Sequence, residues 1–123
     1  MTTTFRLREI AHARCGDKGD TANIGVIAYR PTFYPIILEQ VTIERVRRHF
    51  GDLVRGPIRR YELPNVEAIN LVLENALGGG VTRSLSLDPH GKSYSALILT
   101  MTVEVDDRTA AILKSLGREP VVI

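Results

Sequence analysis

The chain has 123 residues, the usual size of one domain, and its 44% hydrophobic and 24% charged residues are typical of a globular protein. Its longest apolar runs are far too short to span a bilayer, and the first ten residues lack the apolar core of a signal peptide, so we expect neither a membrane partner nor secretion. The net charge is only +2, and a single cysteine excludes an internal disulfide and favours a cytoplasmic location.

Two strands are predicted in the first 30 residues. From Phe5 apolar and polar residues alternate, which is typical of a half-buried strand. The apolar positions are Phe5, Leu7, Ala11, Ala13 and Cys15. The sequence RCGDKGDTANIG at 14–25 is then expected to turn the chain back, and NIGVIAY at 23–29 predicts a central strand because nearly every residue is apolar.

Helical spacing of apolar residues follows at 36–50. Thr42 is placed to cap a second helical segment that ends near Gly51, so we expect one broken helix or two short ones. Residues 57–63 predict a strand, and Pro57 at its start favours a position at a sheet edge.

A helix is predicted over residues 65–77, because apolar residues recur there with a period of 3.6 and Asn65 can cap it. The glycines at 78–80 would end this helix.

The last third of the chain predicts a hairpin and a short helix. Residues 81–87 and 93–105 would pair across the turn DPHGK, and 93–105 has the clearest strand pattern. Residues 108–116 suggest a C-terminal helix. Its inward side chains would be Ala111, Ile112 and Leu116.

This order of elements predicts an α+β fold in which apolar helix stripes cover a sheet. We expect a two-layer sandwich over residues 1–123, with a mixed, mostly antiparallel sheet of about five strands and two main helices on one face.

The segment 14–25 is the first candidate site. Gly16 and Gly19 permit left-handed backbone and close approach, and Arg14 and Lys18 add positive charge, so an anion could rest on the amides. The segment does not match a phosphate loop, since it opens a strand rather than a helix. A hairpin loop whose aspartates bind their own backbone explains the same residues equally well.

A second glycine-rich segment, GGGVTR at 78–83, exceeds what a helix end requires and could let a ligand approach the backbone. Together the two segments give the candidate ligand-binding residues Arg14, Gly16, Asp17, Lys18, Gly19, Asp20, Thr21, Asn23, Gly78, Gly79, Gly80, Thr82 and Arg83.

Residues 1–61 hold 11 Lys or Arg against 6 Asp or Glu, whereas residues 62–123 hold 5 against 8. The excess lies mainly in Arg45, Arg47, Arg48, Arg55, Arg59 and Arg60. Such a cluster suits an anionic ligand or an acidic protein surface, although a solvated helix face beside an edge strand explains it too. We expect no nucleic-acid partner, because no aromatic residues interleave with the arginines.

No complete catalytic or metal-binding set is evident. Cys15, His12 and Asp17 could form a nucleophilic site, but Cys15 has the parity of the core and a lone cysteine is more often a small buried hydrophobe. The remaining histidines, His49 and His90, are scattered, so we expect no metal and no cofactor.

Three segments of the chain resemble a known family. They are AHARCGDKGDTANIGVIA (11–28), HFGDLVRGPIRRYELPN (49–65) and NALGGGVTRSLSLDPHGKSYSALIL (75–99). In this order they are similar to the C-terminal domain of the acyclic terpene utilisation protein AtuA, from the bacterial route that degrades citronellol and geraniol, over roughly residues 6–105. The resemblance implies a ferredoxin-like fold, in the stand-alone form of the domain.

Three functions are compatible with these observations. The first is an accessory module of a bacterial catabolic pathway, for acyclic terpenes or acyl-CoA, that binds an anionic metabolite or docks on a larger AtuA-type subunit. The second is a small hydratase, lyase or isomerase acting on an acyl-CoA. In it Asp17 or Asp20 would be the base, Lys18 or Arg83 the electrostatic stabiliser, and His12 or His90 the proton carrier. The third is a structural homo-oligomer.

A sheet face without helices suggests how the chain would meet a second copy or a larger subunit. The apolar side chains expected on that face are Ile27 and Tyr29 from one strand and Tyr94, Ala96 and Ile98 from another. Residues 121–123 are apolar too, and either reach a neighbour or fold onto the core of their own chain.

Overall fold

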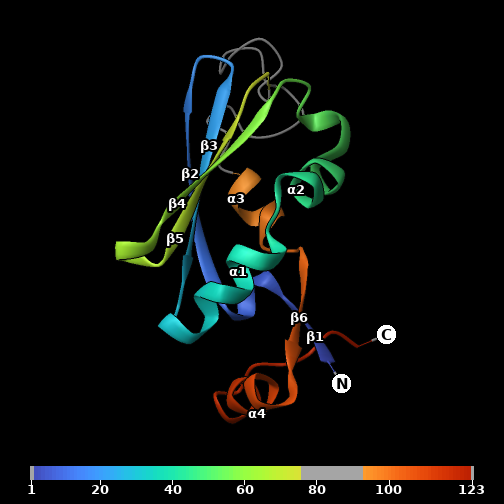
Figure 1. Cartoon of the computed structure of the whole chain (residues 1–123). Coiled ribbons are helices and arrows are strands. Elements are labelled where there is room, and N and C mark those ends of the chain that lie inside the picture. The colour runs from blue at the N-terminus through green and yellow to red at the C-terminus, as the bar shows by residue number, and fades with distance from the viewer. Residues whose placement is uncertain (1, 76–92, 123) are drawn as a thin grey trace.

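The computed structural model describes residues 2–75 and 93–122 of the chain (Figure 1). The strands and helices, in chain order, are β1 (Thr2–Arg6), β2 (Ala11–Lys18), β3 (Thr21–Ala28), α1 (Tyr34–Gln40), α2 (Ile43–Phe50), β4 (Ile58–Leu63), β5 (Ala68–Leu73), α3 (Ser93–Ile98), β6 (Thr102–Asp106) and α4 (Asp107–Ser115). The described strands form a four-stranded sheet of order β2-β3-β5-β4 and a two-stranded sheet of β1 and β6, with every pair antiparallel.

The predicted α+β class and its ferredoxin-like arrangement are confirmed. Helices α1, α2 and α3 lie on one side of the four-stranded sheet in Figure 1 and contact its strands. Strands β3 and β4 run parallel with β5 between them, and α1 and α2 make the crossover, which is the split β-α-β unit of ferredoxin-like folds. After α3 the chain enters β6, which pairs with β1 instead of joining the larger sheet.

Side chains alternate between the two faces of the large sheet. On β3, Ile24 and Val26 are fully buried under the helices, whereas Asn23 on the opposite face is exposed. Ile69 and Leu71 of β5 are buried beside them. The core of the domain therefore lies between the helices and one sheet face, and the other face has no described helix over it.

The predicted helix at 65–77 is wrong, because residues 68–73 form the strand β5. Ile69, Leu71 and Leu73 are buried while Asn70 and Val72 between them are only half-buried, which is the period of a strand. A strand between two others is apolar on both sides, so its sequence also satisfies a helical period.

The chain enters β5 through a turn that no helix could continue. Pro64–Val66 forms a single 3-10 turn, and Glu67 after it takes a left-handed φ of 55°. Asn65 lies inside this turn and caps no helix.

The predicted strand at 93–105 is wrong in its first half. Residues 93–98 form α3, and only the second half becomes β6. Tyr94 and Ile98 are four residues apart and both buried, whereas Ala96 between them is exposed, which is helical spacing. These two side chains therefore belong to the core and not to an open sheet face. The strand predicted at 81–87 lies outside the described residues.

Several local predictions are confirmed with adjustments. The first strand is interrupted by a 3-10 turn at Leu7–Glu9 and becomes β1 and β2. Two short helices, α1 and α2, replace the predicted segment 36–50, and the Oγ1 of Thr42 accepts a hydrogen bond from Arg45 N at 3.2 Å, as a cap should. Strand β4 lies at a sheet edge, as predicted.

Helix α4 confirms the predicted C-terminal helix, but its buried residues are Ala110 and Leu113. Ala111 and Leu116 are exposed, contrary to expectation. Ala110 and Leu113 are three residues apart and share the face that packs against β6 and β1, whereas Leu116 lies just past the end of the helix. Ile112 is half-buried against the core, as predicted.

The C-terminal segment folds back along β1, where Val121 N donates to Thr4 O at 2.8 Å. Val122 next to it is 92% exposed. Among the described residues, no helix is long and apolar enough to cross a membrane.

Candidate functional site

The segment 14–25 is a regular hairpin of β2 and β3 rather than a long loop. Pairing continues to Lys18 opposite Thr21, so only Gly19 and Asp20 make the turn. Gly19 has a φ of +63°, as predicted. Gly16 does not need an unusual angle. A side chain there would meet Asn23 Oδ1 at 2.9 Å, so this glycine makes room for the asparagine opposite.

The sheet register places three of the predicted site residues on the face without a described helix. Gly16 lies opposite Asn23, and Arg14 lies two residues away on the same face, opposite Gly25. The side chains of Arg14 and Asn23 are exposed. Asp20 and Thr21 are half-buried at the tip of the hairpin. The other predicted residues, Gly78, Gly79, Gly80, Thr82 and Arg83, lie outside the described part of the chain. A site that joins the two segments therefore stays a prediction.

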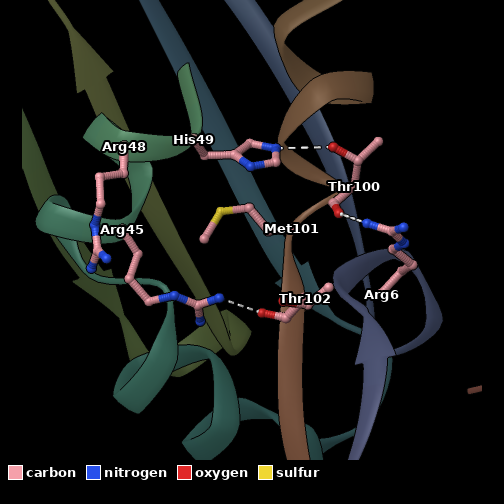
Figure 2. A pocket seen from close by; sticks show the side chains of 7 residues that line it. All are labelled: Arg6, Arg45, Arg48, His49, Thr100, Met101 and Thr102. Carbon is pink, nitrogen blue, oxygen red and sulfur yellow. Dashed lines mark hydrogen bonds between the residues drawn. The ribbon is translucent and has the colours of Figure 1, made fainter. Parts of the chain in front are cut away.

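A basic pocket lies elsewhere, on the helical side of the molecule (Figure 2). It has a volume of about 400 Å³ and is lined by Arg6, Arg45, Arg48, His49, Thr100, Met101 and Thr102. These residues come from β1, α2, the turn after α3, and β6. In Figure 2 the basic side chains surround Met101, which is buried and forms an apolar floor.

Helix α2 supplies one wall of the pocket because of its amphipathic sequence. Val46 and Phe50 are buried in the core, which fixes the rotation of the helix. Arg45, Arg48 and His49 then project together, since residues three and four apart lie on one helix face.

Hydrogen bonds to backbone carbonyl groups hold two of the guanidinium groups in place. Arg45 Nη1 donates to Gln40 O at 3.0 Å, and its Nη2 donates to Thr102 O at 2.6 Å. Arg6 Nη1 donates to Thr100 O at 2.7 Å from the other side of the pocket. These hydrogen-bond partners are neutral carbonyl groups, and each guanidinium group has further N–H donors that a ligand could use.

The imidazole ring of His49 is held by a small network. Its Nε2 lies 2.8 Å from Leu97 O and 2.9 Å from Thr100 Oγ1. The hydroxyl of Thr100 donates to the same carbonyl oxygen at 2.6 Å, so it meets His49 as an acceptor. Both neighbours of Nε2 therefore accept, which requires Nε2 to hold the hydrogen. The Nδ1 of the neutral ring is then an acceptor, and protonation would make it a donor.

Among the described residues, no acidic side chain lines the basic pocket. Arg48 makes no hydrogen bond or ion pair to any described residue, so its charge is available to a ligand. A second hollow of about 650 Å³ adjoins the first through Arg48, and its lining includes Arg47, Arg55 and the acidic residue Asp52. Arginines outnumber the acidic residue in this lining, and a surface with a net positive charge attracts anions.

The arginine cluster seen in the sequence is thus divided by the fold. Arg45 and Arg48 line the basic pocket, whereas Arg59 approaches Glu74 at 3.7 Å and Arg60 donates to Leu38 O and Val41 O. From the sequence, the helical spacing of Arg45, Arg48 and His49 after a cap could have predicted that these three side chains share one face. No local sequence pattern indicates that Arg6 or Thr100 lies near them.

The nucleophilic site suggested by the sequence requires His12 beside Cys15, and the structure places these two side chains on opposite faces of the sheet. Cys15 is half-buried and packs against the core, as its parity predicted. His12 lies on the opposite sheet face, where its ring centroid is 5.4 Å from that of Tyr29. In the part of the chain that the structure describes, no three His, Cys, Asp or Glu side chains come together as a metal site would require.

Comparison with protein-family models finds the AtuA ferredoxin-like domain over residues 5–104. Neither the curated proteins nor the solved structures give a significant match.

Proposed function

The chain belongs to the AtuA ferredoxin-like domain family, and we propose that it acts in terpene utilisation as a module that binds an anionic metabolite in the basic pocket. The observation that carries the proposal is the set of three arginines and one histidine around a buried methionine, with no acidic residue among the described residues of the lining. Positive groups around an apolar floor match a carboxylate or phosphate joined to a hydrocarbon chain.

The size of the pocket agrees with a small ligand or with the head of a larger one. Its volume of about 400 Å³ falls in the range of ligand sites, roughly 300–1,000 Å³. A larger polyanion such as an acyl-CoA would extend past Arg48 into the second hollow, where Arg47 and Arg55 add two positive charges against the one negative charge of Asp52. The ligand class we propose is therefore an acyl-CoA or a related acid.

Thermal-shift titration of the full chain tests the proposal. The panel is inorganic phosphate, coenzyme A, acetyl-CoA and a short branched carboxylate. A ligand present at 100 times its dissociation constant should stabilise the fold by about 2.7 kcal/mol. A flat response to every compound would contradict the proposal.

Two matched variants locate the site. Arg48→Gln removes a pocket charge that makes no hydrogen bond or ion pair to a described residue, so the fold should stay intact while affinity falls about tenfold or more. Arg14→Gln removes an equally exposed charge from the β2–β3 hairpin. Loss of binding in Arg14→Gln alone would move the site to the hairpin predicted from the sequence.

A further inference from the structure

Strand β4 is an outer edge of the four-stranded sheet. Pro57, just before it, accepts a hydrogen bond from Glu74 N at 3.1 Å, so residues 57 and 74 form a bonded pair of the ladder with β5. Bonded pairs alternate along an antiparallel ladder. The peptide groups of Arg59, Tyr61 and Leu63 therefore face β5, and those of the even residues between them face outward.

The outward peptide groups belong to Ile58, Arg60 and Glu62. None of them makes a backbone hydrogen bond to another described element. An edge of this kind is a template for a further strand.

Exposed apolar side chains gather at the same edge. Tyr61 is 49% exposed, Leu63 is 44% exposed, and Val66 in the following turn is 59% exposed. The open edge is thus continuous with apolar surface, which is typical of an interface.

The charges of β4 are complementary to those of a second, antiparallel copy of the same strand when the two copies are centred on Tyr61. Two antiparallel copies centred on Tyr61 place Arg60 opposite the partner's Glu62, and Glu62 opposite the partner's Arg60. Centring the pair on Arg60 instead would oppose two arginines, and centring it on Glu62 would oppose two glutamates. Unlike charges directly opposite stabilise a strand pair and like charges destabilise it, so the charges select the register centred on Tyr61.

The intrachain contacts of these side chains agree with that arrangement. Arg60 Nη2 already donates to Glu62 Oε2 at 3.0 Å, so both groups lie on the same sheet face. The Arg60 side chain is only 18% exposed and is fixed by two carbonyl oxygens of the α1 region, whereas that of Glu62 is 54% exposed. A partner glutamate would meet a positioned arginine.

We propose that two copies of the chain pair through β4 in antiparallel register about Tyr61, with twofold symmetry, and join their four-stranded sheets into one continuous sheet. We expect the partner to be a second copy of the chain, because Arg60 and Glu62 lie opposite Glu62 and Arg60 when β4 pairs with an antiparallel copy of itself. Pro57 and Pro64 bound the strand and limit the pairing to the residues between them.

Charge reversal tests the partner and the register together, with light scattering at tens of micromolar. The unmodified chain should be a dimer, and Glu62→Arg, which opposes two arginines at each contact, should weaken it about tenfold or more. Arg60→Glu should act in the same way, and an equimolar mixture of the two variants should recover dimers. A monomeric unmodified chain, or a dimer that Glu62→Arg leaves unchanged, would overturn the proposal, and a stable complex only with a different protein would do so too.

A cross-linking test covers the case in which Arg60→Glu fails to fold. Tyr61→Cys, in a chain with Cys15→Ser, places two thiols at the symmetry axis, where opposed Cα atoms are about 4.5 Å apart and can form a disulfide. It should give a covalent dimer on a non-reducing gel. Arg59→Cys, which faces the partner's Leu63, should not. Equal cross-linking at both positions would rule out this register.

Discussion

The side-chain amide of Gln40 completes the hydrogen bonding of β6 at Glu104. Its Nε2 donates to Glu104 O at 2.6 Å and its Oε1 accepts from Glu104 N at 2.7 Å, as a neighbouring strand would. Arg45 occupies Thr102 O on the same outer edge. Side chains therefore close the edge of β6, whereas no described residue hydrogen-bonds to the outward peptide groups of β4, the edge proposed for dimer pairing.

Replacing Gln40 by Glu should destabilise the domain. A carboxylate can still accept from Glu104 N but cannot donate to Glu104 O, so about 0.5–1.5 kcal/mol should be lost with that hydrogen bond. Urea denaturation measures the change. Glu39→Gln, at the exposed neighbouring position of α1, is the control and should leave the midpoint in place.

The cap of α2 should matter for stability and for binding. Thr42→Ala removes the acceptor of Arg45 N and should cost about 1 kcal/mol. It should also weaken anion binding, because the first turn of α2 positions the guanidinium of Arg45. Thr42→Ser keeps the hydroxyl and should preserve both properties. Equal losses in the two variants would show that the methyl group, not the cap, is responsible.

Alanine substitutions at two neighbouring residues of β5 should differ in their effect on the free energy of unfolding. Leu71→Ala should lower it by about 2–5 kcal/mol because Leu71 is fully buried. Val72→Ala should lower it much less because Val72 is half-buried on the open face. Denaturation of both variants measures the difference. Similar losses would contradict the alternation of the two faces.

The same strand shows where sequence patterns reach their limit. Ile69, Leu71 and Leu73 fit a strand, but with Ala68 and Val72 they also fit a helix, and only the pairing of β5 with strands on both sides decides between them. Elements with clear start or stop signals were predictable. The cap at Thr42 marks the start of α2, and the prolines on either side of β4 mark the limits of that strand.

The basic pocket was only half accessible to sequence reasoning. Arg45, Arg48 and His49 follow from helical spacing, and the arginine cluster already suggested an anionic ligand. Arg6 and Thr100 are 94 residues apart, and no local pattern predicts that they meet. The sequence could therefore predict the basic residues of α2 and the charge of their ligand. The opposite wall of the pocket, formed by Arg6 and Thr100, depends on the tertiary fold.

The carboxyl group of Glu104 should link stability to pH. Hydrogen bonds from the hydroxyl groups of Thr4 and Thr2 hold its pKa below the ordinary value of 4.5. A carboxyl with a lowered pKa stabilises the fold above its unfolded pKa, and this contribution is lost as the pH falls through the folded pKa.

When the pH falls from about 6 to about 3, the free energy of unfolding should therefore decrease less in Glu104→Gln than in the unmodified chain. Urea denaturation of both proteins at each pH measures the difference. Thr4→Val removes one donor and should reduce the acid-dependent loss in part. An acid response unchanged in both variants would exclude Glu104 as its source.

The pairing of β1 with β6 also constrains the order in which the chain can fold. Thr4 and Glu104 are 100 residues apart, so closing this contact carries a large loss of chain entropy, whereas the β2–β3 hairpin closes over a two-residue turn. During synthesis on the ribosome, β1 emerges first and has to wait for β6. The hairpin and the short helices can form in the meantime, so β1 is paired later than strands that are made after it.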